Sequence, residues 1–218
     1  MSRPTKWAVS FVAMAVVVVV SYQWLDRPIA LFAHSELHGI RVFPLLTYIP
    51  EWMSTLSVLV FLVMGVRALI GRPLSRLEAV ILLAGVSLAV AVAIKDQLKF
   101  AFGRTWPETW INNNPSLIQN GVYGFNPFHG GLSYASFPSG HTTAVCAVVS
   151  VLWVCYPRFR ALYALIVAAV VVGLLGADFH FLSDIVAGGF LGFSTGWLTV
   201  LFWDIGEDRR PRVSPPKP

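Results

Sequence analysis

The sequence predicts an all-α, polytopic membrane protein built as a six-transmembrane-helix bundle. Of its 218 residues, 56% are hydrophobic and only 12% are charged, whereas soluble domains carry about 25% charged residues. The mean hydropathy is +0.67, and apolar runs near or above ~18 residues, long enough to cross a bilayer, recur along the chain. Helices are favoured over strands because a backbone exposed to lipid must satisfy its own hydrogen bonds.

Each predicted span is an apolar segment with polar or charged flanks. The first follows Arg3 and Lys6 and is similar to a signal-peptide core, but no small-x-small cleavage site follows it. We therefore expect a retained span, with removal of the segment as the alternative. The fourth and fifth spans are short but within the range of about 17–25 residues. The predicted spans are 7–25, 52–70, 78–98, 139–156, 161–177 and 182–203.

Six spans place both chain ends on one side of the membrane, and basic residues indicate which side. The N-terminus, the second turn, the fourth-to-fifth turn and the tail hold most of the basic residues. Basic loops face the cytoplasm, so the connections 26–51, 99–138 and 178–181 are expected on the opposite face. We predict a multi-pass integral membrane protein, in a bacterium one of the inner membrane, with these connections facing the periplasm or exterior.

One membrane-embedded domain, 1–204, accounts for nearly the whole chain, and the polar, proline-rich tail 205–218 is predicted to be disordered. The net charge of +5 and the pI near 9.5 are attributed to cytoplasmic loops, and no nucleic-acid partner is expected. Cys146 and Cys155 lie in one apolar segment, too far apart on a straight helix to form a disulfide.

Reactive side chains concentrate at the outward face of the predicted bundle. They are Lys95, Lys99, Arg104, Ser139, His141, His180 and Asp184. Ionisable residues at membrane depth are costly, so the set as a whole indicates a functional site.

The tetrapeptide Pro138-Ser139-Gly140-His141 has the composition of an anion site at a helix start. Proline suits the first helical turn, and Ser139 and Gly140 offer a hydroxyl and free backbone amides to a phosphate. His141 is placed to give a proton to a leaving oxygen. The alternative is an ordinary Pro/Ser helix start with an incidental histidine.

His180 precedes Asp184 by four residues, about one helical turn, so the carboxylate can reach the imidazole. A carboxylate on one ring nitrogen fixes the tautomer and leaves the other nitrogen free as a base or nucleophile. The alternative is a buried, satisfied pair at a helix start, with Ser183 as the cap.

Three cations near the end of the third predicted span are candidate phosphate ligands. Lys95 and Lys99 share a helix face, and Arg104 follows Gly103 in a turn. A guanidinium can bind phosphate in two-pronged fashion. Lysines that extend to the membrane border are the alternative for either lysine alone.

Two further histidine features are weaker. His34 and His38 are four residues apart and can share a helix face. Because no third ligand is expected within reach, we predict an amphipathic interfacial segment and no metal site. His129 lies in an aromatic, glycine-rich loop, where it either lines a headgroup entrance or is solvated.

These residues resemble the type 2 phosphatidic acid phosphatases, which are related to the vanadium haloperoxidases. The family pattern is Lys-x6-Arg-Pro, then Pro-Ser-Gly-His, then Ser-Arg-x5-His-x3-Asp. Residues 138–141 match the second part fully, and His180-x3-Asp184 matches the end of the third, within a resemblance that covers 94–189. Trp106 stands where the family has Arg, with Arg104 two residues earlier. Gly173 and Leu174 stand where it has Ser-Arg, and Asp178 adds a negative charge nearby.

The resemblance implies a metal-independent, cofactor-free lipid phosphatase of the non-cytoplasmic face, acting through a phosphohistidine at His180. Asp184 would orient His180, and His141 would protonate the leaving group. Lys99, Arg104, Ser139 and Gly140 would hold the phosphoryl oxygens, and Lys95 would compensate for a missing cation. The partners expected are membrane lipids and a lipid phosphate or diphosphate. A lipid phosphotransferase and a non-catalytic protein that binds or transports anionic lipid remain as alternatives.

Overall fold

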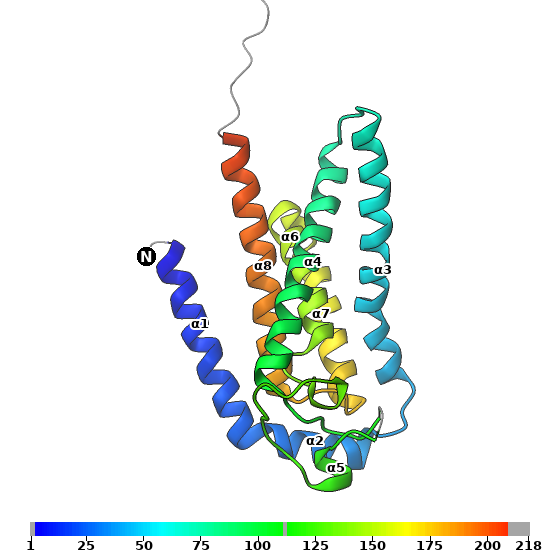
Figure 1. Ribbon diagram of the computed structural model, residues 1–218, viewed down its shortest axis with the longest axis vertical. Helices are drawn as coiled ribbons and strands as arrows, with labels where there is room; N and C mark the ends of the chain where they lie inside the picture. Colours follow the sequence, from blue (N-terminus) through cyan, green and yellow to red (C-terminus); the bar gives the residue numbers. More distant parts are fainter. Residues whose placement is uncertain (1–2, 111–112, 209–218) are drawn as a thin grey trace, which may run out of the picture.

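The computed structural model describes residues 3–110 and 113–208, and within these ranges the chain is helical, with isolated bridges in place of strands (Figure 1). The helices are α1 (Arg3–Val20), α2 (Asp26–Leu37), α3 (Val42–Leu69), α4 (Arg76–Phe102), α5 (Leu117–Asn120), α6 (Gly140–Cys155), α7 (Arg160–Gly176) and α8 (Leu182–Asp208). Short π or 3₁₀ turns occupy Ser21–Leu25, Leu132–Tyr134 and Pro157–Phe159.

The predicted membrane bundle is confirmed. Within the described ranges, five helical segments are long and apolar enough to cross a membrane, and α6, with 16 residues, is a shorter apolar helix packed among them. Outer faces of α1 and α3 expose apolar side chains such as Val12 and Leu62, as contact with lipid requires. The chain is a multi-pass integral membrane protein.

Two predicted boundaries are wrong. Helix α3 begins at Val42, ten residues before the predicted start at Trp52, and it contains Pro50 in its interior. Helix α8 continues to Asp208, so the first four residues of the predicted tail are helical. The rest of that tail lies outside the described residues. The first span also continues through a π turn into α2, which lies across the lower end of the bundle in Figure 1.

Close contact between α6 and α8 brings the catalytic candidates to one end of the molecule. These helices pack more extensively than any other pair among the described residues. Gly188, Gly192 and Gly196 allow the approach, because a Cβ at Gly192 would lie 2.3 Å from the carbonyl oxygen of Thr143. Small residues four apart are the usual means by which membrane helices pack closely.

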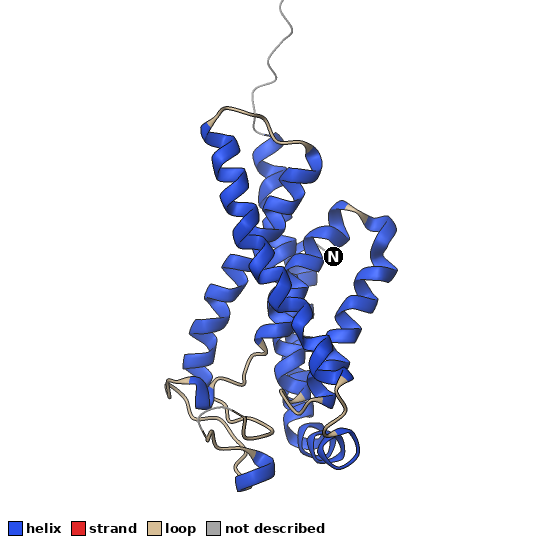
Figure 2. Cartoon of the chain, turned by 90° about the vertical axis from the view of Figure 1, so that its right-hand side faces the viewer, coloured by secondary structure: helices blue, strands red, loops and turns tan. Residues whose placement is uncertain are grey.

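The chain leaves α4 through a glycine that no other residue can replace without strain. Gly103 has φ +57°, and a Cβ there would lie 1.8 Å from the carbonyl oxygen of Asn126. The left-handed residue ends α4 and starts the long connection to α6. Figure 2 shows this loop gathered beneath the bundle, at the end opposite the α3–α4 turn.

Candidate active site

A cavity of about 590 Å³ opens at this end of the bundle, among α3, α4, the start of α6 and the turn before α8. Five predicted site residues line it. They are Lys95, Lys99, Gly140, His141 and His180. The other three, Arg104, Ser139 and Asp184, are fully buried and are not among its lining residues.

His180 lies between the cavity and the buried Asp184. Its Nδ1 is 3.4 Å from Asp184 Oδ2, and that oxygen also accepts hydrogen bonds from Ser136 Oγ at 2.6 Å and Phe181 N at 3.1 Å. The contact is the predicted one, but His180 belongs to the turn that precedes α8 and not to the helix itself. Burial lowers the pKa of His180, although Asp184 opposes the shift, so the imidazole is neutral at neutral pH.

His141 faces His180 across the cavity. The two ring centroids are 5.9 Å apart, and His141 Nε2 is 3.8 Å from Glu51 Oε1. Gly140 and His141 form the first turn of α6, where backbone amides lack helical partners. Ser139 is the N-cap of α6, and its Oγ accepts a hydrogen bond from Thr142 N, so this hydroxyl caps the helix.

Both candidate lysines reach the cavity wall. Lys95 Nζ is 2.6 Å from Asp96 Oδ1, at the border of the cavity. Lys99 donates to the carbonyl oxygen of Ala135 and lies 5.4 Å from the ring centroid of Trp106. The cavity therefore has two ammonium groups beside two imidazoles.

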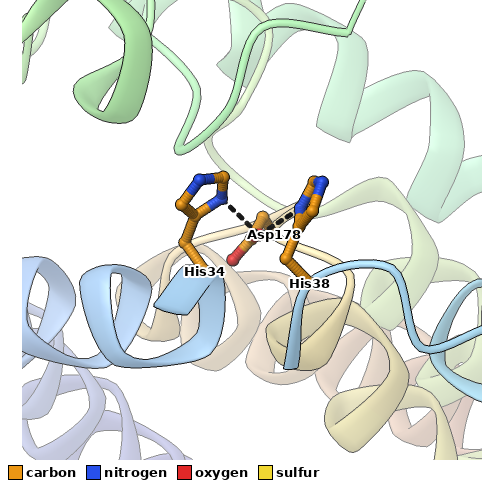
Figure 3. A group of neighbouring side chains, drawn as sticks. All are labelled: His34, His38 and Asp178. Carbon is orange, nitrogen blue, oxygen red and sulfur yellow. Dashed lines mark hydrogen bonds and ion pairs between the residues drawn. The ribbon is translucent and has the colours of Figure 1, made fainter. Parts of the chain in front are cut away.

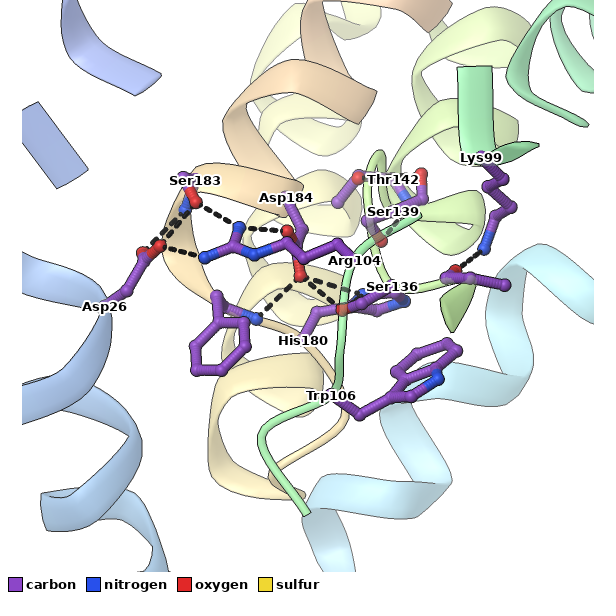
Figure 4. Close-up of polar contacts among 12 residues, drawn as sticks. Asp26, Lys99, Arg104, Trp106, Ser136, Ser139, Thr142, His180, Ser183 and Asp184 are labelled. Atoms are coloured by element: carbon purple, nitrogen blue, oxygen red, sulfur yellow. Dashed lines mark hydrogen bonds and ion pairs between the residues drawn. The ribbon is translucent and has the colours of Figure 1, made fainter. Parts of the chain in front are cut away.

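Arg104 does not line the cavity, and its guanidinium belongs to a buried charge network (Figure 4). Its guanidinium donates to Asp184 Oδ1, to Ser183 Oγ at 2.6 Å, to Asp26 Oδ2 at 2.7 Å and to Tyr123 OH at 3.2 Å. Burial alone would lower the pKa of Arg104, but Asp184 and Asp26 outweigh burial and raise it. Arg104 therefore stays charged and fixes the carboxylate that contacts His180.

The two departures from the family pattern have different surroundings. Trp106 lines the cavity, with its ring centroid 5.1 Å from that of His180, and its Nε1 donates to Leu132 O at 2.8 Å. Leu174 is fully buried and packs in the hydrophobic core with Val145 and Ile185. An aromatic wall thus stands where the first motif has its arginine.

Sequence reasoning missed Asp26, Ser136 and Glu51. Asp26 is fully buried and accepts from both Ser183 N, at 2.9 Å, and Arg104. A carboxylate directly after a long apolar run was the available signal, because such a group at membrane depth needs a partner. Ser136 and Glu51 carried no comparable signal.

The expectation that His34 and His38 lack a third ligand is wrong. Asp178 Oδ2 lies 3.2 Å from His34 Nδ1 and 3.4 Å from His38 Nδ1. The partner is 144 residues away in the sequence from His34, so local spacing could not reveal it. His129 lies elsewhere, with its ring centroid 4.1 Å from that of Tyr134.

Fold and site together define a polytopic membrane protein with a His–Asp pair and a second histidine at a cation-lined cavity. The chain belongs to the PAP2 superfamily, whose family model matches residues 80–206, more than half of the 218 residues.

Two curated relatives each match half of the chain. A lipid A 1-phosphatase of Rhizobium etli is 35% identical over 112 residues, which is 50% of this chain and 42% of the relative. A lipid A 1-phosphatase of Rhizobium johnstonii is 34% identical over 112 residues, 50% of this chain and 40% of the relative. The chain thus matches about two fifths of the length of these relatives.

The fold is also similar to a solved structure. The transmembrane PAP2-type phosphatidylglycerolphosphate phosphatase from Bacillus subtilis superimposes with a TM-score of 0.55, over 98% of this chain and 100% of that one. Because the sequences are 18% identical, the likeness concerns the fold.

Proposed function

We propose that this protein is a lipid phosphatase that hydrolyses a phosphate monoester or diphosphate of a lipid through a phosphohistidine at His180. The observation that carries the proposal is the position of His180. Its Nδ1 contacts Asp184, and its ring lines a cavity that His141 and Lys99 also line. With Nδ1 turned to Asp184, Nε2 is the nitrogen left to act as nucleophile.

In the first step, the lone pair of His180 Nε2 attacks phosphorus and the bond from phosphorus to the lipid oxygen breaks. His141 gives its proton to that oxygen, which leaves as an alcohol or, from a diphosphate, as a phosphate. The ring of His180 becomes positively charged, and the ionised Asp184 stabilises it. No metal ion takes part in this step.

In the second step, water attacks the phosphorus of the phosphohistidine while His141 accepts its proton. The bond from phosphorus to Nε2 breaks, its electron pair returns to His180, and orthophosphate leaves. Both histidines are then restored for the next cycle.

The charge on the transferred group is balanced by cations and amides on the cavity wall. Lys95 and Lys99 supply the ammonium groups, and the first amides of α6, at Gly140 and His141, supply N–H donors at a positive helix end. Ser139 acts indirectly, as the cap that holds this helix end in place.

The lipid class is proposed from the relatives, which are named lipid A 1-phosphatases. A phosphorylated glycolipid therefore leads the candidate substrates, ahead of phosphatidate, phosphatidylglycerophosphate and polyprenyl diphosphate. We further propose that the cavity faces the non-cytoplasmic side, and the basic residues in the turns at the other end of the bundle support this orientation. In a bacterium this is the periplasmic face of the inner membrane.

The test is phosphate release by the purified protein from these four lipids in detergent micelles. Wild type should release orthophosphate from at least one lipid, and His180→Ala should lower the rate at least about 10³-fold. His141→Ala should lower it by about 10²–10⁴-fold. The matched control is His129→Ala, which changes a histidine outside the cavity lining and should keep the wild-type rate.

Three outcomes would contradict parts of the proposal. Full activity in His180→Ala would remove the nucleophile assignment. Release of orthophosphate from none of the lipids by wild type would favour a protein that only binds anionic lipid. Transfer of ³²P from the lipid to an added lipid alcohol, at the expense of orthophosphate, would make the protein a phosphotransferase.

A further inference from the structure

The end of α2 and the turn before α8 bring four potential metal ligands together outside the catalytic cavity. His34 and His38 come from the end of α2, and Asp178 comes from the turn two residues before His180 (Figure 3). Glu108 comes from the loop that follows α4. One ligand atom each from His34, His38 and Asp178 lies within 4.8 Å of the others. Glu108 Oε2 is 3.3 Å from His34 Nδ1.

The separations match those around a tetrahedral zinc ion. Bonds of about 2.0–2.1 Å to nitrogen and about 2.0–2.2 Å to oxygen put neighbouring ligand atoms about 3.3–3.5 Å apart. The pairs His34–Asp178, His34–Glu108 and His38–Asp178 are 3.2, 3.3 and 3.4 Å apart. His34, His38 and Asp178 therefore form the core of the cluster, each with a ligand atom within 4.8 Å of the others, and Glu108 joins it through its approach to His34.

Hydrogen bonding alone does not account for this convergence. His34 Nδ1 faces the carboxylates of both Glu108 and Asp178, but one ring nitrogen carries at most one proton. Asp178 has a side chain that is fully buried, and its Oδ1 has no hydrogen-bond partner among the described residues. A buried carboxylate without full compensation is costly, and a cation removes that cost.

We propose that His34, His38, Asp178 and Glu108 form a binding site for a divalent transition-metal ion such as Zn²⁺. Two imidazoles and two carboxylates are a ligand set that suits zinc, whereas Mg²⁺ and Ca²⁺ prefer oxygen ligands alone. Glu108 is two residues after Trp106, and Asp178 is two residues before His180. The ion would link α2 to the segments that carry Trp106 and His180, two lining residues of the catalytic cavity, without contacting the reacting atoms.

The test is Zn²⁺ binding by full-length protein that has no polyhistidine tag and has been stripped with EDTA. Competition against a chromophoric chelator gives the stoichiometry and Kd. We expect one Zn²⁺ per chain, no displacement by equimolar Mg²⁺ or Ca²⁺, and a melting temperature about 5 °C or more higher at saturation.

Two variants remove ligands while preserving the fold. The His38 side chain is 61% exposed, so His38→Ala disturbs little packing. Asp178 has φ +56°, a conformation that Asn adopts readily, so Asp178→Asn removes the charge and keeps the shape. Each should weaken Zn²⁺ binding at least about 100-fold, since loss of even an outer-shell partner costs 10–100-fold.

Two matched histidine variants locate the site. His129→Ala and His180→Ala should both bind one Zn²⁺ with the wild-type Kd. Wild type that binds no Zn²⁺, or unchanged binding in His38→Ala and Asp178→Asn, would overturn the proposal. Loss of binding in His180→Ala would also overturn it, because the ion would then sit in the catalytic cavity.

Discussion

Arg104 offers the sharpest test of the site, because the family resemblance and the structure give it different neighbours. The resemblance implies that Arg104 holds phosphate. In the structure its buried guanidinium contacts Asp26, Asp184, Ser183 and Tyr123, and it is not a lining residue of the cavity. We therefore expect Arg104→Gln to act mainly on stability and on the orientation of Asp184.

The magnitude follows from the charges left behind. Arg104→Gln leaves two buried carboxylates, Asp26 and Asp184, without their shared cation. Removing one partner of a buried ion pair costs about 3–5 kcal/mol. At about 2–4 °C per kcal/mol for a chain of this size, the melting temperature should fall by about 6–20 °C. Adding Asp26→Asn to Arg104→Gln removes one of the two unpaired charges and should recover part of the lost melting temperature.

The assay is thermal unfolding in detergent, followed by the fluorescence of the eight tryptophans. Inhibition of phosphate release by orthovanadate, a phosphate mimic, is measured in parallel. Arg41→Gln, a change of the same kind at an exposed arginine, is the control and should unfold like wild type. If Arg104→Gln melts at the wild-type temperature but loses affinity for vanadate, Arg104 faces phosphate and the reasoning is refuted.

Three further predictions follow from packing and burial. Gly192→Leu should lower the melting temperature strongly, because its Cβ alone would lie 2.3 Å from Thr143 O. Leu174→Arg should unfold the protein or abolish its activity, because it places an unpaired charge in the core. Because burial lowers the pKa of His180, this pKa should lie below about 6.5 in a pH titration followed by ¹⁵N-histidine NMR spectra. His180 should therefore become protonated only at a lower pH than an ordinary histidine.

Each of these predictions has a matched comparison. Gly189→Ala places a Cβ 3.8 Å from Cys146 Sγ, an ordinary contact, and should be tolerated. Leu174→Met conserves volume and should remain active. Higher activity in Leu174→Arg would mean that this position reaches the phosphate. The His180 resonance is assigned by its absence in His180→Ala, and a pKa at or above about 6.5 would contradict the effect of burial.

Local patterns in the sequence predicted the bundle and part of the site. Hydropathy depends on composition within a short window, so the spans were found although the start of α3 was misplaced around Pro50. The His180–Asp184 contact was found because the two residues are four apart. The partners of Arg104 were not, because Asp26 is 78 residues away and approaches only once α1 and α2 have packed.

Apart from Ser136, the residues whose contacts escaped prediction share a location in the chain. Asp26, His34, His38 and Glu51 all precede residue 80, where the PAP2 match begins. Each one nevertheless contacts a residue inside the matched region. Asp26 contacts Arg104, both histidines contact Asp178, and Glu51 contacts His141. The N-terminal segments therefore add a layer of charge around the family motifs.

That layer has a direct consequence for the proposed chemistry. Arg104 contributes one positive charge and Asp26 and Asp184 contribute two negative charges, so the network behind His180 carries a net charge of about −1. This negative charge stabilises a neutral imidazole only slightly. It stabilises the cationic ring of a phosphohistidine much more strongly, because the surroundings have a low dielectric constant. The network thus favours the intermediate over the resting state, and Asp26→Asn should slow formation of the phosphohistidine while leaving lipid binding unchanged. Rapid-quench measurement of ³²P on the protein would test this, and an unchanged rate would show that Asp26 serves only to stabilise the fold.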